Sequence, residues 1–340
     1  MRTIDWVDGR IELVDQTLLP NELVVRKVDS LEELIFDIQR LAVRGAPALG
    51  VAGALGIAAL GVKGVSGEEL QQSALRLANA RPTAVNLSWG VGQVMEIADQ
   101  GGEAMLARAL AIRDQDIESC YSMGQYGADL VEELLGEGAY NIMTICNTGG
   151  LAAVERGTAL GVVQTLHERG RLREALPLET RPLLQGSRLT AWELQQMGAP
   201  FRLVVDSAGP FLLSRGYAQA VFIGADRIAA NGDTANKIGS FSLSLGAKAA
   251  GVPFIVVAPE STIDMSTASG QEIEIEDRGS EEVVNFRGMQ TAPAGTTAIN
   301  PAFDVTPREN ITAIVTDRRV IRVNRGQTPG NTPIGEIRCS

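Results

Sequence analysis

Histidine is nearly absent from this chain of 340 residues, in which His167 is the only example. Ser-His-Asp and Cys-His catalytic arrangements therefore have a single candidate base. His167 lies near the end of a predicted helix, shortly before Gly170, where the helix dipole favours a histidine. We interpret it as structural and expect acid-base chemistry to rest on Cys, Asp, Lys or Tyr side chains.

Cysteine is also scarce. The three cysteines, Cys120, Cys146 and Cys339, are odd in number and show no CxxC spacing, which argues against disulfides and against a zinc site. No cluster of His, Asp or Glu has the spacing of metal ligands. Neither the GxGxxG pattern of dinucleotide sites nor the P-loop pattern of NTP sites occurs. We therefore expect no metal and no cofactor.

Aromatic residues, basic runs and long apolar runs are lacking as well. Aromatics make up 4% of the chain and the formal net charge is −11, with no run of Lys and Arg, which excludes a nucleic-acid surface. The apolar run 48–62 is interrupted by four glycines and ends before Lys63, so it is too short to span a bilayer, and no membrane partner is expected. Residues 1–6 contain no signal-peptide core, and we expect a cytoplasmic location.

The spacing of apolar residues is helical in the first part of the chain. Leu31, Leu34 and Ile38 recur at intervals of three and four, and Ser30 with Glu33 forms a capping box before them. Further helices are predicted over 68–80, 89–99 and 104–135, and short strands over 4–25. We predict a mainly helical N-terminal domain with a small β region over residues 1–138.

The pattern changes after Tyr140 to short β-rich runs that alternate with helices. The runs are 141–145, 175–180, 201–205, 220–223, 254–258 and 311–316. This alternation predicts an α/β domain over residues 139–340 with a doubly wound, mostly parallel sheet and right-handed crossovers. The segment 279–307 has no clear periodicity, and we interpret it as a loop excursion.

Polar residues follow several of the predicted strands, at the edge where open α/β sheets bind ligands. Cys146 begins the stretch CNTGG directly after the first run, where it is either a small buried hydrophobe or a reactive thiol. Asp226 follows the fourth run. It either caps the next helix or pairs with Arg227, or it is partly desolvated with a raised pKa that suits acid-base chemistry.

Several loops have the equipment to bind an anion. Small residues and helix N-termini supply backbone donors, and Arg181, Arg188 and Lys237 add positive charge, which favours a phosphorylated small molecule. The stretches 44–50 and 81–87 are each either an anion-facing turn or a linker between helices. The stretch 231–237 is either a turn with a helix cap or part of the site.

Together these stretches resemble the methylthioribose-1-phosphate isomerase family, which shares its fold with the alpha, beta and delta regulatory subunits of a translation-initiation nucleotide exchange factor. Eight ordered strings over nearly the whole chain carry the resemblance. They are RGAPA at 44–48, RPTAVNL at 81–87, CNTG at 146–149, ETRP at 179–182, LQG at 184–186, GADRI at 224–228, NGDTANKIG at 231–239 and NPAFDVTP at 300–307.

The resemblance implies a fold, a function and a set of site residues. It implies an N-terminal helical domain joined to a Rossmann-like C-terminal domain, as a homodimer that acts on a sugar phosphate. Cys146 and Asp226 fall on the family's catalytic pair. Seven further residues fall on its substrate-binding positions: Arg44, Gly45, Ala46, Arg81, Gln185, Asn236 and Lys237.

Three functions compete under this resemblance. The first is isomerisation of 5-methylthioribose 1-phosphate in methionine salvage, and the second is a sister isomerase for ribose 1,5-bisphosphate or 5-deoxyribose 1-phosphate. The third is a non-catalytic regulatory subunit of the exchange-factor type, against which the presence of both Cys146 and Asp226 argues. The charged pair Glu155 and Arg156 departs from the family's pattern and leaves the substituent at C5 of the sugar open.

Overall fold

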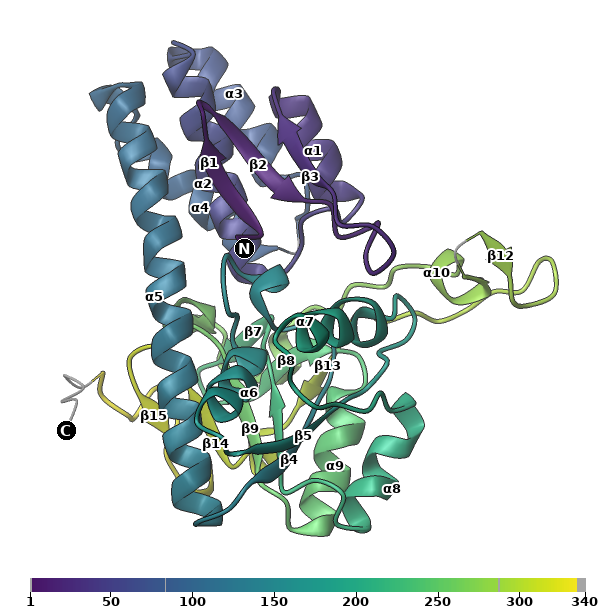
Figure 1. Cartoon of the computed structure of the whole chain (residues 1–340). Helices are drawn as coiled ribbons and strands as arrows, with labels where there is room; N and C mark the ends of the chain where they lie inside the picture. The colour runs from purple at the N-terminus through teal and green to yellow at the C-terminus, as the bar shows by residue number, and fades with distance from the viewer. Residues whose placement is uncertain (1, 83, 287, 335–340) are drawn as a thin grey trace. The chain divides into compact units, whose positions relative to one another are not determined.

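The computed structural model describes residues 2–82, 84–286 and 288–334 (Figure 1). Cys339, and Thr83 of the 81–87 stretch, lie outside the described residues. The chain forms two compact units, Met1–Tyr121 with Thr148–Gly161, and Ser122–Asn147 with Val162–Ser340. The long helix α5 (Gly102–Leu135) contributes to both. The predicted division at residue 138 stays a prediction.

The first unit, hereafter the helical unit, combines a small antiparallel sheet with helices. The sheet has the order β1 (Ile4–Val7), β2 (Arg10–Val14), β3 (Val25–Val28). The helices are α1 (Leu31–Gln39), α2 (Ala46–Val62), α3 (Gly67–Ala78) and α4 (Val85–Met95). The predicted cap is confirmed, because the Glu33 N–H donates to Ser30 Oγ at 3.2 Å. The helical pattern and the N-terminal strands are therefore as predicted, except that α4 begins and ends four residues before the predicted 89–99 helix.

Helix α2 is the apolar run of the sequence, and it forms the centre of the helical unit. Every residue from Ala48 to Ala58 is buried. Its glycines allow α4 to approach closely, since a Cβ on Gly53 would lie 2.6 Å from the carbonyl oxygen of Leu87. No helix among residues 2–82, 84–286 and 288–334 is long and apolar enough to cross a membrane.

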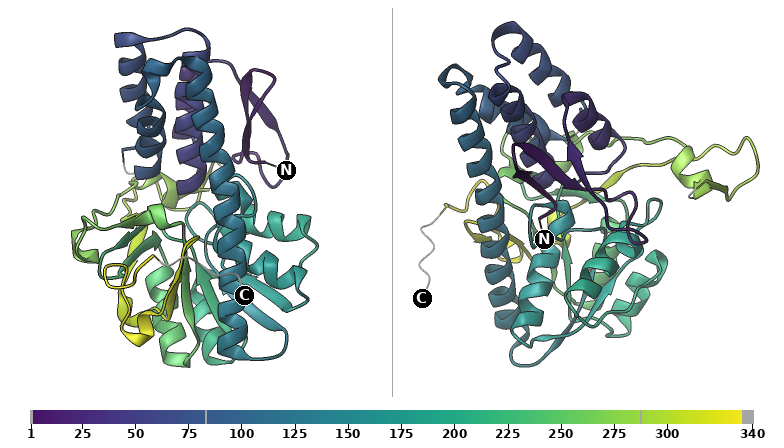
Figure 2. Two further views of the ribbon diagram at one scale, coloured as in Figure 1. Left: turned by 90° about the vertical axis from the view of Figure 1, so that its left-hand side faces the viewer. Right: turned by 45° about the horizontal axis from the view of Figure 1, so that its top comes forward.

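The second unit, hereafter the sheet unit, is built on a six-stranded sheet of order β15-β14-β9-β6-β4-β5 (Figures 1 and 2). Its strands are β4 (Tyr140–Thr144), β5 (Leu172–Pro177), β6 (Ala220–Ile223), β9 (Phe254–Val257), β14 (Ala313–Val315) and β15 (Val320–Ile321). All are parallel except β15 at the edge. The predicted doubly wound, mostly parallel sheet is confirmed.

Helices connect these strands, and the order of the strands defines a switch point. The helices are α6 (Ala159–Glu168), α7 (Ala191–Gln196), α8 (Gly209–Ser214) and α9 (Ser240–Ala250). The chain passes from β4 to β5 on one side and then returns to place β6 on the other side of β4. Ligands of open α/β sheets bind outside the carboxyl ends of the strands at such a reversal. The candidate crevice is therefore at the ends of β4 and β6.

Two predictions about the sheet unit are wrong. Residues 201–205 form no strand and make only two isolated bridges to the β5 segment, at Phe201 and Val204. Leu203 and Val205 remain 47% and 57% exposed, because this segment lies at the edge of the sheet and buries only part of its apolar residues.

The 279–307 segment is not a plain loop. It contains α10 (Glu281–Val284), β11 (Asn285–Phe286) and β12 (Met289–Gln290), which form a projecting arm in Figure 1, followed by β13 (Phe303–Thr306). A second sheet has the order β10-β7-β8-β13, with β7 (Arg227–Ala229), β8 (Thr234–Lys237) and β10 (Ile263–Asp264). These strands have two to four residues and carry polar side chains, so their sequence shows little β pattern.

Candidate functional site

Cys146 lies just beyond the carboxyl end of β4, at the switch point. It is a free cysteine, it is 8% exposed, and its φ of 65° places it in the left-handed region. A residue with a Cβ adopts this conformation at a cost in free energy, so neighbouring contacts must hold it there. Burial and left-handed backbone geometry thus coincide at the predicted catalytic cysteine.

Two threonine hydroxyls hold the backbone of Cys146. Its N–H donates to Thr180 Oγ1 at 2.8 Å, and its carbonyl oxygen accepts a hydrogen bond from Thr190 Oγ1 at 2.6 Å. Thr180 follows β5, and Thr190 ends the π-helical turn η3 (Gly186–Thr190) that leads into α7. Asn147 is 2% exposed, and its amide donates to Thr190 Oγ1 and to the carboxylate of Glu193.

Asp226 lies three residues beyond the end of β6, the strand next to β4. Its N–H donates to the carbonyl oxygen of Ala235 at 2.9 Å, which fixes it beside β8. The helix-capping alternative is excluded, because the chain enters strand β7 after Asp226. Arg227, the other partner considered for Asp226, forms an ion pair with Asp264 at 3.7 Å. The expected partial desolvation is wrong, since Asp226 is exposed where the chain leaves the buried sheet.

Strand β8 and the turn before α9 bring Asn236 and Lys237 to this same edge. A Cβ on Gly239 would lie 2.9 Å from Ile145 Cδ1, so the turn packs directly beside the Cys146 loop. Asn236 donates to Ser240 Oγ at 2.8 Å. The Lys237 ammonium donates to the Ala302 carbonyl at 2.8 Å and lies 4.9 Å from the centre of the Phe303 ring. Both side chains are buried and oriented by these contacts.

Asp304, on β13 opposite Asn236, holds the start of α9. Its carboxylate accepts hydrogen bonds from the N–H groups of Gly239 at 2.7 Å and Phe241 at 3.0 Å. Burial raises the pKa of Asp304 to about 6, although these two N–H groups and the charge of Lys237 act in the opposite direction. The turn that carries Asn236 and Lys237 is thereby tied to a titratable group.

Gln185 immediately precedes the π-helical turn η3. It is 5% exposed, and its Oε1 has no hydrogen-bond partner among the described residues. A buried acceptor left without a donor costs free energy, and such groups in native proteins are often completed by a ligand or water. The structure therefore places five predicted residues at one edge of the sheet unit: Cys146, Asp226 and Gln185 after strands β4, β6 and β5, and Asn236 and Lys237 on β8.

The other predicted residues lie in the helical unit, around the N-terminus of α2. Arg44 Nε donates to Gln16 Oε1 at 3.2 Å, and Gln16 in turn donates to the Leu151 carbonyl at 2.7 Å. Gly45 is the N-cap of α2, with a φ of 93°, and Ala46 is the first helical residue. The first N–H groups of a helix have no partner within it, and they favour an anion. The 44–50 stretch is thus a helix start rather than a plain linker.

Arg81 precedes α4, and its carbonyl oxygen accepts a hydrogen bond from the Ala84 N–H at 3.0 Å. Helices α2 and α4 lie against each other near their N-terminal ends, since a Cβ on Gly90 would lie 2.0 Å from the Gly50 carbonyl oxygen and a Cβ on Gly50 would lie 3.3 Å from the Asn86 carbonyl oxygen. Arg81 therefore lies at the same end of the helical unit as Arg44, Gly45 and Ala46.

The charged pair that departs from the family's pattern also lies in the helical unit. Glu155 forms an ion pair with Arg2 at 2.8 Å, and the Arg156 guanidinium lies 4.8 Å from the centre of the Tyr121 ring. Both side chains are thus engaged within the unit. Their predicted effect on the substrate's C5 substituent stays a prediction.

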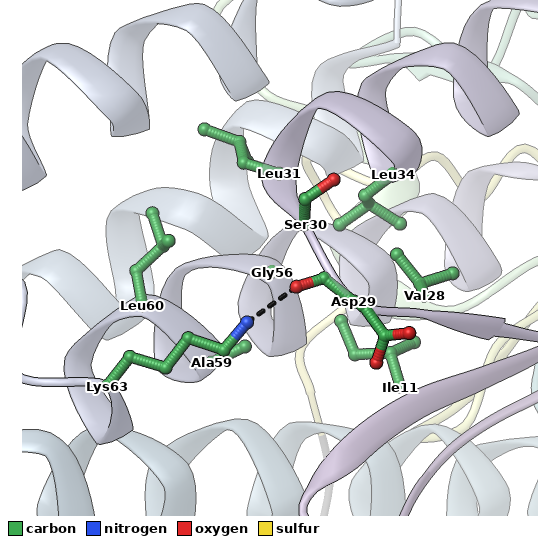
Figure 3. A pocket seen from close by; sticks show the side chains of 10 residues that line it. All are labelled: Ile11, Val28, Asp29, Ser30, Leu31, Leu34, Gly56, Ala59, Leu60 and Lys63. Carbon is green, nitrogen blue, oxygen red and sulfur yellow. Dashed lines mark hydrogen bonds between the residues drawn. The ribbon is translucent and has the colours of Figure 1, made fainter.

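A small pocket in the helical unit lies apart from all the predicted site residues. Figure 3 shows its lining, which is mostly apolar and includes Leu31, Leu34 and Gly56, with Lys63 Nζ donating to the Asp29 carbonyl at 2.6 Å. Its volume of about 20 Å³ is room for one water molecule. Within the part of the chain that the structure describes, no group of three or more His, Cys, Asp or Glu is placed to hold a metal ion.

Comparison with known protein families gives a match over residues 42–322 to the initiation factor 2 subunit family. The chain belongs to this family. Among curated members, it is 48% identical to the methylthioribose-1-phosphate isomerase of Pelotomaculum thermopropionicum, over 94% of this chain and 91% of that protein. It is 45% identical to the 5-deoxyribose 1-phosphate isomerase of Moorella thermoacetica, over 98% of each.

Solved structures of two similar proteins have the same fold. The 5-methylthioribose 1-phosphate isomerase of Pyrococcus horikoshii superposes with a TM-score of 0.87 at 40% identity, over 94% of this chain and 92% of that one. Subunit delta of translation initiation factor eIF-2B from A. fulgidus gives 0.84 at 40% identity, over 95% and 96%. The resemblance to methylthioribose-1-phosphate isomerases is confirmed.

The sequence did not indicate which residues fix Cys146 and the turn between β8 and α9 in place. Thr180, Thr190 and Asp304 touch Cys146 or the β8–α9 turn through hydrogen bonds from distant segments. Thr180 and Asp304 stand within the ETRP and NPAFDVTP strings, which marked the segments without indicating these contacts. Thr190 lies outside these strings, and no sequence pattern indicated its contact with Cys146.

Proposed function

We propose that this protein is an aldose-ketose isomerase that converts 5-methylthioribose 1-phosphate to 5-methylthioribulose 1-phosphate in methionine salvage. One observation carries the proposal. Cys146 and Asp226, the pair to which the resemblance assigns catalysis, follow β4 and β6, neighbouring parallel strands at the switch point of the sheet. Relatives with this activity in their names match nearly the whole chain.

The substrate demands unusual help from its enzyme. A phosphate on the anomeric carbon prevents the spontaneous ring opening on which other sugar isomerases depend. In our proposal Asp226 protonates the ring oxygen as its bond to C1 breaks, and Cys146 removes the proton from C2 and returns it to C1 through an enediol-type intermediate. The proton of the C2 hydroxyl passes to the Asp226 carboxylate as the ketone forms, which restores Asp226 and balances the reaction without an oxidant or reductant.

The substrate-binding residues then have simple roles. Positive charge and helix N–H groups hold the phosphate, and buried amide and ammonium groups hold the hydroxyls. The residues proposed for binding are Arg44, Gly45, Ala46, Arg81, Gln185, Asn236 and Lys237. The buried Oε1 of Gln185, which has no hydrogen-bond partner among the described residues, supports a role in substrate binding, because a substrate hydroxyl would supply the missing donor.

Two details of the chemistry are open to direct measurement. The roles of Cys146 and Asp226 can be exchanged, and a hydride shift from C2 to C1 is the alternative to proton transfer. Substrate deuterated at C2 separates the two routes: loss of deuterium to water is expected for proton transfer, and complete retention at C1 would contradict it.

We predict that Cys146→Ser and Asp226→Asn each lower kcat by about a hundredfold or more, which is the usual contribution of an acid or base in the transition state. The measurement is steady-state turnover of 5-methylthioribose 1-phosphate. Cys120→Ala, which changes a buried cysteine of α5, is the control and should keep near-normal kcat. The catalytic assignment is wrong if both site variants keep near-normal turnover.

A second function has its own support, because the 5-deoxyribose 1-phosphate isomerase of Moorella thermoacetica is 45% identical over 98% of both chains. The same pair would perform the same chemistry on a substrate that differs only at C5. A panel of three sugar 1-phosphates with methylthio, hydrogen or phosphate at C5 decides between them by kcat/KM. We expect the highest value for the methylthio compound.

The remaining proposals concern assembly and location. We propose a homodimer, which the resemblance implies, and sedimentation of the purified protein tests it. A cytoplasmic location stays a proposal, tested by cell fractionation. A purely regulatory role of the exchange-factor type would leave all three members of the sugar phosphate panel unconverted.

A further inference from the structure

The backbone of Cys146 is held from both sides by side chains that no catalytic assignment includes. Its φ of 65° is unfavourable for a residue with a Cβ, and the conformation persists only where the surroundings impose it. Thr180 Oγ1 accepts from the Cys146 N–H at 2.8 Å, and Thr190 Oγ1 donates to the Cys146 carbonyl at 2.6 Å. Both peptide groups that flank the cysteine side chain are therefore fixed.

Each hydroxyl is directed by a second partner. Thr180 Oγ1 donates its proton to the Leu178 carbonyl at 2.9 Å, which leaves its lone pairs for Cys146. Thr190 Oγ1 accepts from the Asn147 amide at 3.3 Å, which leaves its proton for the Cys146 carbonyl. The two threonines are 0% and 1% exposed, so water does not compete for these bonds.

The loop that carries Thr180 is itself held. Thr180 has a φ of 68°, and the carboxylate of Asp206 accepts from the N–H groups of Thr180 and Arg181, each at 2.7 Å. On the other side, Thr190 is continuous with α7, where Glu193 accepts from the Asn147 amide. Two separate segments, one after β5 and one at the start of α7, thus converge on a single residue.

We propose that Thr180 and Thr190 are positioning residues, which hold Cys146 in the left-handed conformation so that its thiol lies where the C2 proton must be handled. The proposal rests on the proposed function, in which Cys146 moves that proton. Proton transfer requires hydrogen-bond distances between heavy atoms, and a shift of about 1 Å in the reacting group costs about a hundredfold in rate. The gain in rate from a correctly placed thiol therefore outweighs the free-energy cost of the left-handed backbone conformation at Cys146.

The test uses Thr180→Val and Thr190→Val, which remove the hydroxyl and keep the shape of the side chain. We expect each to lower kcat by about tenfold or more while KM changes by less than about threefold, because substrate-binding groups are untouched. Thr180→Ser and Thr190→Ser retain the hydroxyl and should restore kcat to within about threefold of the unchanged protein.

The matched control is Thr144→Val. Thr144 lies on β4, two residues before Cys146; it is 1% exposed, and its hydroxyl has no hydrogen-bond partner among the described residues. Its kcat should stay within about twofold of the unchanged protein, since no hydrogen bond is lost. If the valine variants fail to fold, Thr180→Ala and Thr190→Ala replace them with the same expectations.

A second readout does not depend on activity. Iodoacetamide labelling of the Cys146 peptide, followed by mass spectrometry, should be at least about threefold faster in Thr180→Val and Thr190→Val than in Thr144→Val, because a released loop exposes the thiol. An active protein whose valine variants keep kcat overturns the positioning role and leaves the proposed function intact. A protein inactive on every panel substrate overturns the proposed function. In that case, unchanged labelling would also contradict the conclusion that Thr180 and Thr190 restrain the Cys146 loop, and faster labelling would support it.

Discussion

Gly45 is the residue at which the start of α2 is most constrained. Its φ of 93° lies in the region that favours glycine, and a Cβ there would be 2.3 Å from the Ala152 carbonyl oxygen. Strain and backbone overlap therefore act together at the residue that opens the proposed phosphate-binding helix. Neither can be relieved by a side-chain rotation, because the neighbouring atoms belong to the main chain.

We predict that Gly45→Ala lowers the free energy of unfolding by about 3 kcal/mol and raises KM for the sugar phosphate, because the helix start must move away from residue 152. Urea unfolding and steady-state kinetics measure the two effects. Gly64→Ala is the matched control: it shares a positive φ of 85°, but nothing lies within 4 Å of the added Cβ. It should cost about 1 kcal/mol. Equal losses in the two variants would contradict the role of the Ala152 contact.

Single residues were predictable where strand ends determined their place. Cys146 and Asp226 were expected after two β runs, and the structure places them beyond the ends of β4 and β6. The exposure of Asp226 was not predictable, because it depends on how the chain leaves the sheet rather than on the apolar run before it. The partners of Cys146 were hidden for a similar reason, since they come from residues 34 and 44 positions away.

At the scale of elements, the turn between β8 and α9 depends on a carboxylate that belongs to β13. Asp304 accepts from two N–H groups at the start of α9, and burial raises its pKa to about 6. In the unfolded chain its pKa is the ordinary 3.8. The folded protein therefore binds more protons than the unfolded chain between pH 4 and 6, and this contribution to stability is lost as the pH rises through about 6.

We predict that this one group lowers the free energy of unfolding by about 2 kcal/mol between pH 4 and pH 7, from a shift of about two pKa units. Asp304→Asn removes the titration, so its stability should depend less on pH in this interval than that of the unchanged protein. Urea unfolding at several pH values measures the difference. Parallel pH profiles for the two proteins would show that Asp304 has no raised pKa.

Elements were predictable where apolar periodicity was strong, and not where strands were short and polar. The helices of the first unit and the strands β4, β6, β9 and β14 follow from their patterns. Strand β8 was not predicted, because Thr234, Asn236 and Lys237 are polar and their β structure comes from pairing with β7 and β13. The 201–205 run shows the opposite case: its composition is typical of a strand, but it makes only isolated bridges.

At the scale of the whole chain, local patterns predicted the two kinds of architecture but not how the chain is shared between them. Residues 148–161 follow the first strand of the sheet unit, yet they pack within the helical unit, where the Thr3 N–H donates to the Val154 carbonyl at 2.9 Å. Contacts between segments so distant in sequence leave no periodicity to detect. The resemblance covers strings from both units, but it did not indicate that residues 148–161 pack within the helical unit.

The proposed phosphate site obtains its positive charge from the chain itself, and this leads to a prediction about metals. In this proposal Arg44 and Arg81 carry the charge that a divalent cation supplies in many phosphate sites, with the N–H groups at the start of α2 as further donors. We predict that a chelator leaves turnover unchanged, whereas Arg81→Gln raises KM by about tenfold or more through the lost charge-assisted hydrogen bonds. Turnover before and after EDTA dialysis, and with Mg²⁺ added back, makes the measurement. Activity that disappears with EDTA and returns with the cation would assign the phosphate to a metal ion rather than to these side chains.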